Sequence, residues 1–215
     1  MFKQPIIVFE GIEGSGKSYH INNIEKLLIK TKKKYVKLRE PGGSTNSEKI
    51  RKIILNNKSS FNSLTDLLLC LASRSENVQK IIKKNYRKKV IIIDRFIDST
   101  IAYQHYGMGI DKKLIVYLNK FILKKIRPDF TFLNIVNKKN LKIRLNKRKN
   151  KNRYDKFDYN FYNTVQEGFL KLATNKKKYM IVDSNNKISV NKEIILNKVK
   201  ELIKLWFQLP LIKHN

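Results

Sequence analysis

The 215-residue sequence predicts an α/β fold, a three-layer sandwich in which a five-stranded parallel sheet carries helices on both faces. Short apolar runs alternate with helix-like stretches, and each run is continuous, as in strands that are covered on both faces. A glycine-rich loop follows the first run. No repeat, Gly/Ser linker or second core interrupts this order, so we expect a single domain over residues 1–215.

Five apolar runs are the expected strands. They span residues 6–9, 35–38, 90–93, 130–136 and 179–182. In open sheets of this kind, ligands bind beyond the carboxyl ends of the strands. The residues that directly follow each run are therefore the first candidates for a functional site.

Helical spacing of apolar residues accounts for the stretches between the strands. Ile21, Ile24, Leu27 and Leu28 recur at this spacing after the first run. The same spacing predicts helices at residues 47–55, 64–82, 112–126 and 160–173, and a last helix at about residues 192–207. Asp111 directly precedes the third of the four, where its side chain can cap the helix.

The loop after the first strand fits the phosphate-binding pattern G-x-x-x-x-G-K-[ST]. Its backbone N–H groups would point at phosphate oxygens at a helix N-terminus, and Lys17 would add a positive charge. An ordinary strand-to-helix turn is the alternative, but the strand and helix that a phosphate site requires are both present. The loop residues are Gly11, Ile12, Glu13, Gly14, Ser15, Gly16, Lys17 and Ser18.

Charged residues also follow the second and third strands. Arg39 and Glu40 precede a turn that begins at Pro41, and Asp94 and Arg95 follow three isoleucines. A carboxylate at this edge can support a Mg²⁺ ion held at the phosphate loop. An arginine there can bind a phosphate through two hydrogen bonds. A surface ion pair between Asp94 and Arg95 is the alternative interpretation.

The formal net charge of +30 is the most unusual feature of the composition. Taken alone, it would indicate a polyanionic partner such as nucleic acid or a membrane surface. The lysines are spread along the whole chain, so we expect no specific nucleic acid partner and no membrane partner. Only nine of the 47 basic residues are arginines, so each arginine is a stronger candidate for a function than a lysine.

The cellular compartment is indicated by what the sequence lacks. A single cysteine excludes an internal disulfide and favours a reducing environment. The first residues run straight into the first strand, without room for a signal peptide, and no apolar run reaches membrane-spanning length. We therefore expect a cytoplasmic protein.

Several motifs together resemble those of the bacterial thymidylate kinases, a P-loop kinase family that transfers the γ-phosphoryl group of ATP to thymidine 5′-monophosphate (dTMP) in dTTP synthesis. The likeness runs from about residue 7 to residue 182. Its motifs are, in order, FEGIEGSGKS, REPGGS followed by SEKIR, LASR, DRFIDSTIAYQ, RPD and NRYDKF. Many nucleotide-binding families share the first motif, but the complete series is specific.

The resemblance implies a donor site and an acceptor site in one P-loop kinase domain. The loop from Gly11 to Ser18 would bind the ATP phosphates, with Lys17 between the β and γ phosphates. Ser18 and Asp94 would hold Mg²⁺. The residues implied in the acceptor site are Glu13, Arg39, Pro41, Arg51, Cys70, Arg74, Arg95, Ser99, Thr100, Tyr103 and Gln104.

The same resemblance implies how the acceptor phosphate and sugar would be held. Arg39 and Arg95 would bind the 5′-phosphate of dTMP, with Arg51 nearby. Glu13 would face the 3′-hydroxyl group. Tyr103 would lie against C2′ and leave no space for a ribose hydroxyl, so the site would prefer deoxyribose by shape.

The thymine base would lie against the apolar segment that ends in LASR. Arg74 matches the arginine that donates to thymine O4, and Thr100 and Gln104 match positions that complete the base contacts. Cys70 stands where the family usually has a phenylalanine that stacks on thymine, so Phe61 or another neighbouring ring would have to replace it.

A basic lid is implied at about residues 143–156, between two helices. The phosphate loop has no arginine at its variable positions, and family members of that kind supply one from a mobile lid. We expect Arg144 to bind ATP, and a solvated basic loop is the alternative. Asn152 replaces an acid that is common before the lid arginine, and Phe96 replaces a frequent tyrosine. The residues expected to act in catalysis are Lys17, Arg95, Arg148 and Arg153.

Relatives in this family pair through apolar helix faces, so the resemblance also implies a homodimer. The segment LTDLLLCLA could provide such a face.

Two other functions remain open at the level of sequence. A deoxynucleoside kinase would use a carboxylate such as Glu40 to deprotonate a 5′-hydroxyl, but Arg39 and Arg95 would then crowd a neutral group with charge. A nucleic-acid-binding ATPase would explain the net charge, yet no series of base-stacking aromatic residues occurs outside the kinase motifs. The sequence shows no Ser-His-Asp set. This fits phosphoryl transfer to a phosphate group, because that group is already ionised and can attack without a general base.

Overall fold

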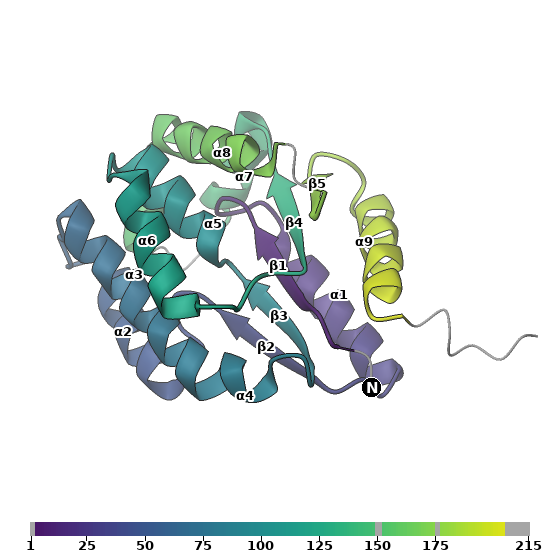
Figure 1. The fold of residues 1–215 in the computed structure, drawn as a ribbon. Helices are drawn as coiled ribbons and strands as arrows, with labels where there is room; N and C mark the ends of the chain where they lie inside the picture. Colours follow the sequence, from purple (N-terminus) through teal and green to yellow (C-terminus); the bar gives the residue numbers. More distant parts are fainter. Residues whose placement is uncertain (1–2, 149–151, 175–176, 205–215) are drawn as a thin grey trace, which may run out of the picture.

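The strands form the parallel sheet that the sequence predicts (Figure 1). The structure is a computed structural model and describes residues 3–148, 152–174 and 177–204. The strand order is β2-β3-β1-β4-β5, and every neighbouring pair is parallel. The strands are β1 (Ile6–Glu10), β2 (Tyr35–Arg39), β3 (Val90–Asp94), β4 (Phe130–Ile135) and β5 (Tyr179–Asp183).

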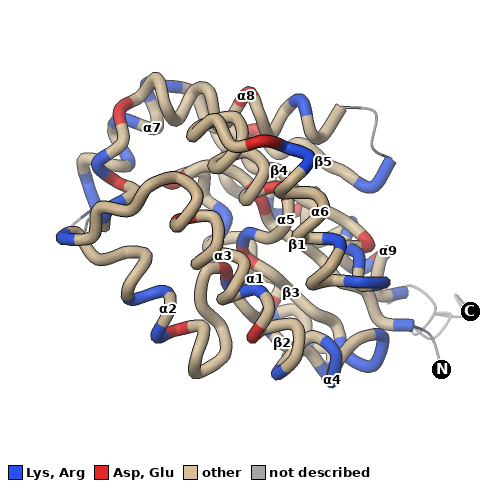
Figure 2. The backbone as a smooth tube through the Cα atoms, turned by 60° about the vertical axis from the view of Figure 1, so that its left-hand side comes forward, with Lys and Arg blue, Asp and Glu red and all other residues tan. Residues whose placement is uncertain are grey.

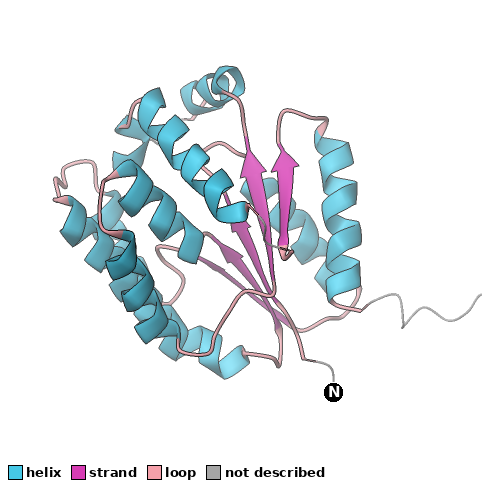
Figure 3. Ribbon diagram, turned by 45° about the horizontal axis from the view of Figure 1, so that its top comes forward, coloured by secondary structure: helices cyan, strands magenta, loops and turns pink. Residues whose placement is uncertain are grey.

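Helices cover both faces of the sheet, which confirms the predicted three-layer α/β class (Figure 3). The α-helices are α1 (Lys17–Lys30), α2 (Thr45–Leu55), α3 (Ser63–Asn77), α4 (Lys83–Asn85), α5 (Ile97–Thr100), α6 (Lys112–Leu123), α7 (Lys138–Asn146), α8 (Tyr159–Ala173) and α9 (Ile188–Leu202). Two π-helical segments, η1 (Val78–Ile82) and η2 (Ile101–Gly107), and one 3₁₀ turn, η3 (Arg153–Lys156), complete the described elements.

Alternate residues of each strand pack against different helices. Ile7 and Phe9 of β1 belong to a core with α1 and α9, whereas Ile6 and Val8 belong to a core with η1 and the end of α6. All of β1 is buried. Because both faces are covered, apolar residues are favoured at every position from Ile6 to Phe9, and this explains the continuous apolar run in the sequence.

Most predicted helices are present, with boundaries that differ by a few residues. Asp111 caps α6 as predicted, since its side chain accepts a hydrogen bond from the Lys113 N–H group at 2.8 Å. The last helix is Ile188–Leu202 rather than residues 192–207, and residues 205–207 of that prediction lie outside the described residues.

Two described helical segments of more than four residues, η2 and α7, have no counterpart in the sequence prediction. Residues 101–104 of η2 are consecutively buried, so this segment lacks the one-sided periodicity of a surface helix. Helix α7 has the opposite property, because Leu141 is its one buried residue. Apolar spacing predicts helices that have one apolar face, and neither segment has a clear one.

The register of the sheet places three strand ends at the same level. Phe9 of β1 pairs with Asp94 of β3, and Arg39 of β2 pairs with the same aspartate. The residues that follow these strands therefore meet at one edge of the sheet. This edge carries the phosphate loop and the charged residues that follow β2 and β3.

Basic residues are spread over helices and loops around the molecule (Figure 2). Their distribution in space matches their even spread along the sequence. Among the described residues, no helix combines the length and the apolar character needed to cross a bilayer.

The core assignment can be tested with two neighbouring residues of α1. Leu28 is fully buried, whereas Ile29 is 61% exposed. We expect Leu28→Ala to lower the free energy of unfolding by about 3 kcal/mol, because it removes buried methyl groups and leaves a cavity. Ile29→Ala should change it by less than about 0.5 kcal/mol. Denaturant unfolding measures both, and equal losses would contradict the assignment.

Candidate active site

A cavity of about 630 Å³ opens at the carboxyl ends of β1, β2 and β3. Its wall also includes residues of α3, η2 and α7. The volume lies within the range of sites that bind small molecules. The cavity is therefore at the sheet edge where the sequence predicts ligand binding.

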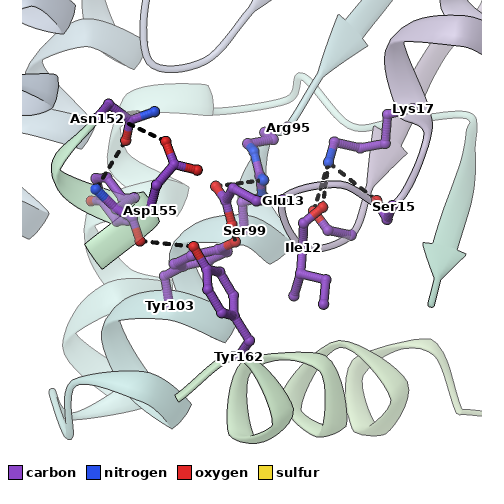
Figure 4. A network of polar contacts seen from close by, with 12 residues as sticks. Ile12, Glu13, Ser15, Lys17, Arg95, Ser99, Tyr103, Asn152, Asp155 and Tyr162 are labelled. Atoms are coloured by element: carbon purple, nitrogen blue, oxygen red, sulfur yellow. Dashed lines mark hydrogen bonds and ion pairs between the residues drawn. The ribbon is translucent and has the colours of Figure 1, made fainter. Parts of the chain in front are cut away.

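The phosphate loop forms one wall of this cavity. The loop connects β1 to α1, and Lys17 is the first residue of α1. Lys17 Nζ donates hydrogen bonds to the carbonyl oxygens of Gly11 and Ile12 at 2.8 and 2.9 Å and to Ser15 Oγ at 3.4 Å. These bonds hold the ammonium group inside the curve of the loop (Figure 4).

The ends of β4 and β5 support the loop from outside. A Cβ atom on Gly11 would overlap the carbonyl oxygen of Asn134, and the φ angle of Gly11 is 130°, so this position requires glycine. Ser184 Oγ donates a hydrogen bond to the Ser15 carbonyl oxygen at 2.6 Å. The loop conformation is thus fixed by the sheet as well as by its own sequence.

Glu13 and Arg95 connect the loop to the end of β3 (Figure 4). Arg95 Nη2 donates to Glu13 Oε1 at 2.8 Å, and the Tyr103 hydroxyl donates to Glu13 Oε2. The Arg95 guanidinium also lies over the Tyr103 ring, 5.2 Å from its centroid. Arg95 has a φ angle of 67°, an uncommon conformation outside glycine that often marks a functional position.

The cluster shifts the pKa values of its members. Burial is the main cause that lowers the pKa of Lys17 to about 8, and the nearby Arg95 cation lowers it further. Burial opposes ionisation of Glu13, but Arg95, Lys17 and the Tyr103 hydroxyl outweigh it, so the pKa of Glu13 lies below its ordinary value. Glu13 is therefore ionised at neutral pH and orients Arg95.

Cations outnumber carboxylates on the cavity wall. Arg39 is paired with Glu48 at 3.0 Å, and Arg51 Nη1 donates to the Pro41 carbonyl oxygen at 2.6 Å. Such a wall suits a ligand with several phosphate groups. The basic lining residues are Lys17, Arg39, Arg51, Arg74, Arg95, Arg144, Lys147 and Arg148, and the acidic ones are Glu13, Glu40 and Asp94.

The residues expected to hold Mg²⁺ lie on the same wall. Ser18 and Asp94 both line the cavity. Asp94 Oδ1 is buried and has no hydrogen-bond partner within the described part of the chain. A carboxylate and a hydroxyl oxygen are ligands that Mg²⁺ prefers, so the residues fit this ion.

Arg74 lines the cavity but is also a structural residue. It is 2% exposed, and its guanidinium donates to Glu40 Oε2 at 2.7 Å, to Asn119 Oδ1 at 2.5 Å and to the Phe96 carbonyl oxygen at 2.7 Å. Burial raises the pKa of Glu40, although Arg74 opposes the shift. The resemblance implies a base contact for Arg74 but none of these three partners.

The three arginines of the predicted lid point in different directions. Arg144 donates to the carbonyl oxygens of Gly14 and Ser184 at 2.9 and 2.7 Å, next to the phosphate loop. Arg148 lines the cavity and donates to Asp155 Oδ1 at 2.6 Å. Residues 149–151 of the predicted lid lie outside the described residues.

Arg153 lies elsewhere than we expected from the sequence. Its Nη2 atom donates to Asp66 of α3, and its Nε atom donates to the Ile54 carbonyl oxygen at 2.9 Å. It does not belong to the cavity lining. The carboxylate of Asp66 is the physical reason, because it holds the guanidinium on the α3 side of the site. This placement gives no support to a contact between Arg153 and ATP.

The remaining predicted acceptor residues come together on the cavity wall. Those that line it are Pro41, Cys70, Ser99, Thr100, Tyr103 and Gln104. The Tyr154 hydroxyl contacts the Cys70 thiol, and burial raises the pKa of this thiol to about 11. Phe61, which we considered as a replacement ring, is not part of the lining.

The predicted loop residues differ in their relation to the cavity. Glu13, Gly14, Lys17 and Ser18 line it, whereas Gly16 lines a second cavity of about 250 Å³ with His20 and Arg144. Ile12 is buried in the core instead. The cavity lining includes none of Gly11, Ile12 and Ser15. These three residues can shape the backbone of the loop, but they place no side chain on the cavity wall.

Comparison with known proteins agrees with this geometry. The family model for thymidylate kinase matches residues 9–195. The chain belongs to the thymidylate kinase family. It is 42% identical over 174 residues to the thymidylate kinase of Wolbachia pipientis wMel, covering 78% of this chain and 84% of the relative. It is 38% identical to that of Sulfurihydrogenibium sp., covering 91% and 96% of the two chains.

A solved structure of the same family shares the fold. The thymidylate kinase from Ehrlichia chaffeensis superposes with a TM-score of 0.74 at 32% identity and covers 92% of this chain and 99% of its own. The predicted family and the α/β fold are both confirmed.

Two buried carboxylates that hold residues of this thymidylate kinase site were missed by sequence reasoning. Glu10, the last residue of β1, is 1% exposed and accepts hydrogen bonds from the Phe96 N–H group at 2.9 Å and from Ser99 Oγ at 2.5 Å. Asp66 is 1% exposed and binds Arg153. The sequence could have indicated Glu10, because an acidic residue directly follows the apolar run of the first strand. Asp66 gave no signal, because an aspartate in the first turn of a helix is ordinary.

Glu10 should make stability depend on pH. Burial and the nearby Asp98 raise its pKa to about 7 from an ordinary value near 4.5. Between these values the unfolded chain has released the proton while the folded protein still holds it, so the stability contributed by Glu10 falls as the pH rises. We expect the unfolding free energy of the wild type, relative to Glu10→Gln, to fall by on the order of 3 kcal/mol from pH 4.5 to 8. A pH-independent difference in denaturant titrations would disprove the assignment.

Proposed function

We propose that this protein transfers the γ-phosphoryl group of ATP to dTMP, which gives dTDP and ADP for dTTP synthesis. The observation that carries the proposal is that one cavity joins the phosphate loop to Arg39, Arg51 and Arg95. A phosphoryl transfer between two nucleotides needs two anion sites that face each other. Membership of the thymidylate kinase family supports dTMP as the acceptor.

The donor nucleotide would occupy the phosphate loop and the second cavity. The N–H groups at the start of α1 would bind the β and γ phosphates, with Lys17 between them. The second cavity, of about 250 Å³, is next to the loop and could receive the adenosine part. Arg144 lines both cavities, so it would lie between the base and the phosphates.

The acceptor would bind along α3 and η2. Arg39 and Arg95 would hold the 5′-phosphate, and Tyr103 would face C2′ of the sugar. Arg74 has five N–H groups, of which three donate to the protein oxygens named above. Two remain to donate to thymine O4, so its structural role is compatible with base binding.

The reaction needs alignment and charge neutralisation rather than a general base. An oxygen of the dTMP phosphate would attack the γ-phosphorus atom while the bond to the oxygen that bridges the β and γ phosphates breaks. Lys17, Arg95 and Arg148 line the cavity where negative charge develops and would stabilise it. Mg²⁺ held by Ser18 and Asp94 would supply further positive charge.

The use of Glu40 as a base, as in a deoxynucleoside kinase, is disfavoured by its surroundings. Glu40 Oε2 accepts a hydrogen bond from the buried guanidinium of Arg74 at 2.7 Å. Arg39 and Arg95 line the same cavity and would place charge around a neutral 5′-hydroxyl, whereas they suit an acceptor phosphate. We therefore retain a nucleoside monophosphate as the acceptor.

A homodimer and a cytoplasmic location complete the proposal. Large apolar side chains are exposed on α3 and α6, which pack side by side (Figure 1). A second copy of the chain could cover this face. The residues are Leu64, Leu68, Leu114, Val116, Tyr117 and Phe121, and Phe121 is 71% exposed. The single cysteine is consistent with the reducing cytoplasm.

A coupled assay of ADP formation tests the function. We expect rapid turnover with ATP and dTMP, and turnover with thymidine or CMP that is lower by at least about 100-fold, because neither matches both the phosphate and the base contacts. Lys17→Ala should reduce kcat/KM for dTMP by about 1,000-fold. Faster phosphorylation of thymidine would favour the deoxynucleoside kinase, and ATP hydrolysis stimulated by DNA would favour the ATPase.

The dimer can be tested by sedimentation velocity. We expect the wild type to sediment as a dimer and Phe121→Asp to sediment as a monomer, because a charge would be buried at the interface. Lys120→Asp, at a neighbouring polar position of α6, is a control for added negative charge. A wild-type monomer at micromolar concentration would contradict the proposed dimer.

A further inference from the structure

Asp66 of α3 is the meeting point of three segments that are distant in sequence. Its Oδ1 atom accepts a hydrogen bond from Arg153, and its Oδ2 atom accepts from the Tyr154 hydroxyl at 2.6 Å and from Gln104 Nε2 at 3.0 Å. The side chain is 1% exposed. A buried carboxylate is costly unless it is fully paired, so these three donors are fixed in place around it.

The donors belong to two different elements of the fold. Gln104 lies in η2 and is among the residues expected to contact the acceptor base, whereas Arg153 and Tyr154 belong to η3. Asp66 itself does not line the cavity, but Gln104 and Tyr154 do. The carboxylate therefore acts through its neighbours.

Tyr154 occupies the part of the wall next to Cys70. It is 8% exposed, and its ring lies edge-on to that of Tyr103, with centroids 5.8 Å apart. The Tyr162 hydroxyl donates to the Tyr154 carbonyl oxygen at 2.7 Å. Tyr154 thus presents an aromatic ring where the neighbouring helix α3 presents only a small thiol.

Arg153 fixes η3 to the same region. Its Nε atom donates to the Ile54 carbonyl oxygen in the last turn of α2, and its guanidinium lies over the Phe61 ring, 5.3 Å from the centroid. Lys156 Nζ donates to the Asn57 carbonyl oxygen at 3.0 Å. These contacts join η3 to α2, α3 and the connection between them.

We propose that Asp66 is a positioning residue that holds η3 against α3, so that Tyr154 replaces the missing aromatic side chain in the acceptor-base pocket. The acceptor is that of the proposed function, on which this inference depends. Loss of the Asp66 carboxylate should release Tyr154 and Gln104 together. Binding of the acceptor should weaken, while ATP binding and the chemical step should change little.

Kinetics of Asp66→Asn provide the first test. We expect KM for dTMP to rise about tenfold, with kcat within about threefold of the wild type and KM for ATP unchanged. Tyr154→Phe, which keeps the ring, should raise KM less. Because both changes act on one unit, the double variant should be no worse than Asp66→Asn. If the effects of the two single changes on KM for dTMP multiply in the double variant, Asp66 and Tyr154 do not act as one unit.

Cys70 supplies a second readout that does not require activity. It is the single cysteine of the chain and contacts Tyr154. We expect a thiol-reactive disulfide reagent to label Cys70 on the order of 10-fold faster in Asp66→Asn than in the wild type, because access to the thiol increases. Tyr154→Ala should give a similar increase.

Asp129→Asn is the matched control. It also removes an Asp–Arg pair, with Arg87 at 2.7 Å, but at the opposite end of the sheet. It should leave both KM for dTMP and the labelling rate unchanged. If Asp66→Asn behaves like this control, the inference is wrong.

The outcomes separate the inference from the proposed function. A wild type that does not phosphorylate dTMP rejects the function, and the labelling rates still decide whether Asp66 fixes Tyr154. Should Asp66→Asn fail to fold, Tyr154→Phe and Tyr154→Ala carry the kinetic and labelling tests. Unchanged KM and labelling in both tyrosine variants would overturn the role of Tyr154.

Discussion

The pairing of β1 with β3 is the constraint on which the site depends. Because these parallel strands end at the same level, the phosphate loop and Arg95 lie side by side, and the 2.8 Å ion pair between Arg95 and Glu13 closes the gap between them. A loop of backbone N–H groups and a guanidinium group are thereby held at a fixed separation. No local sequence feature could impose this arrangement without the sheet, since the two elements are about 80 residues apart.

Arginine–carboxylate pairs recur in the cavity wall and next to it. Arg95 is held by Glu13, Arg74 by Glu40 and Arg153 by Asp66. The carboxylates of Glu40 and Asp66 are buried, and that of Glu13 is 14% exposed. Burying such pairs contributes little net stability, because desolvation offsets most of the attraction. Their benefit is orientation, since a guanidinium that is fixed before the substrate arrives loses less conformational freedom when the substrate binds. The numerous lysines of the chain cannot replace these arginines, because an ammonium group lacks the planar fork that makes several directed bonds.

The sequence was informative wherever local rules decide the structure. Apolar runs and helical spacing predicted the sheet and most helices, and the glycine pattern predicted the phosphate loop. The residues after β2 and β3 were also identified, because a parallel sheet brings the strand ends to one edge. Partners across the fold could not be predicted in the same way. Nothing in the order of residues indicates that Arg153 meets Asp66, which is 87 positions away, or that Glu10 meets Ser99. Hydrogen bonds between distant side chains depend on the final packing, and a motif records which residue is present but not the direction in which it points.

The central claim is that two anion sites share one cavity, separated by the length of a phosphate chain. Isothermal titration calorimetry with a bisubstrate analogue, adenosine joined to thymidine through a pentaphosphate, tests this claim most directly. Because one molecule would occupy both sites, its Kd should be at least about 100-fold lower than that of ATP or dTMP alone. An affinity no better than that of the single nucleotides would show that the two sites cannot be occupied together, and it would contradict the account.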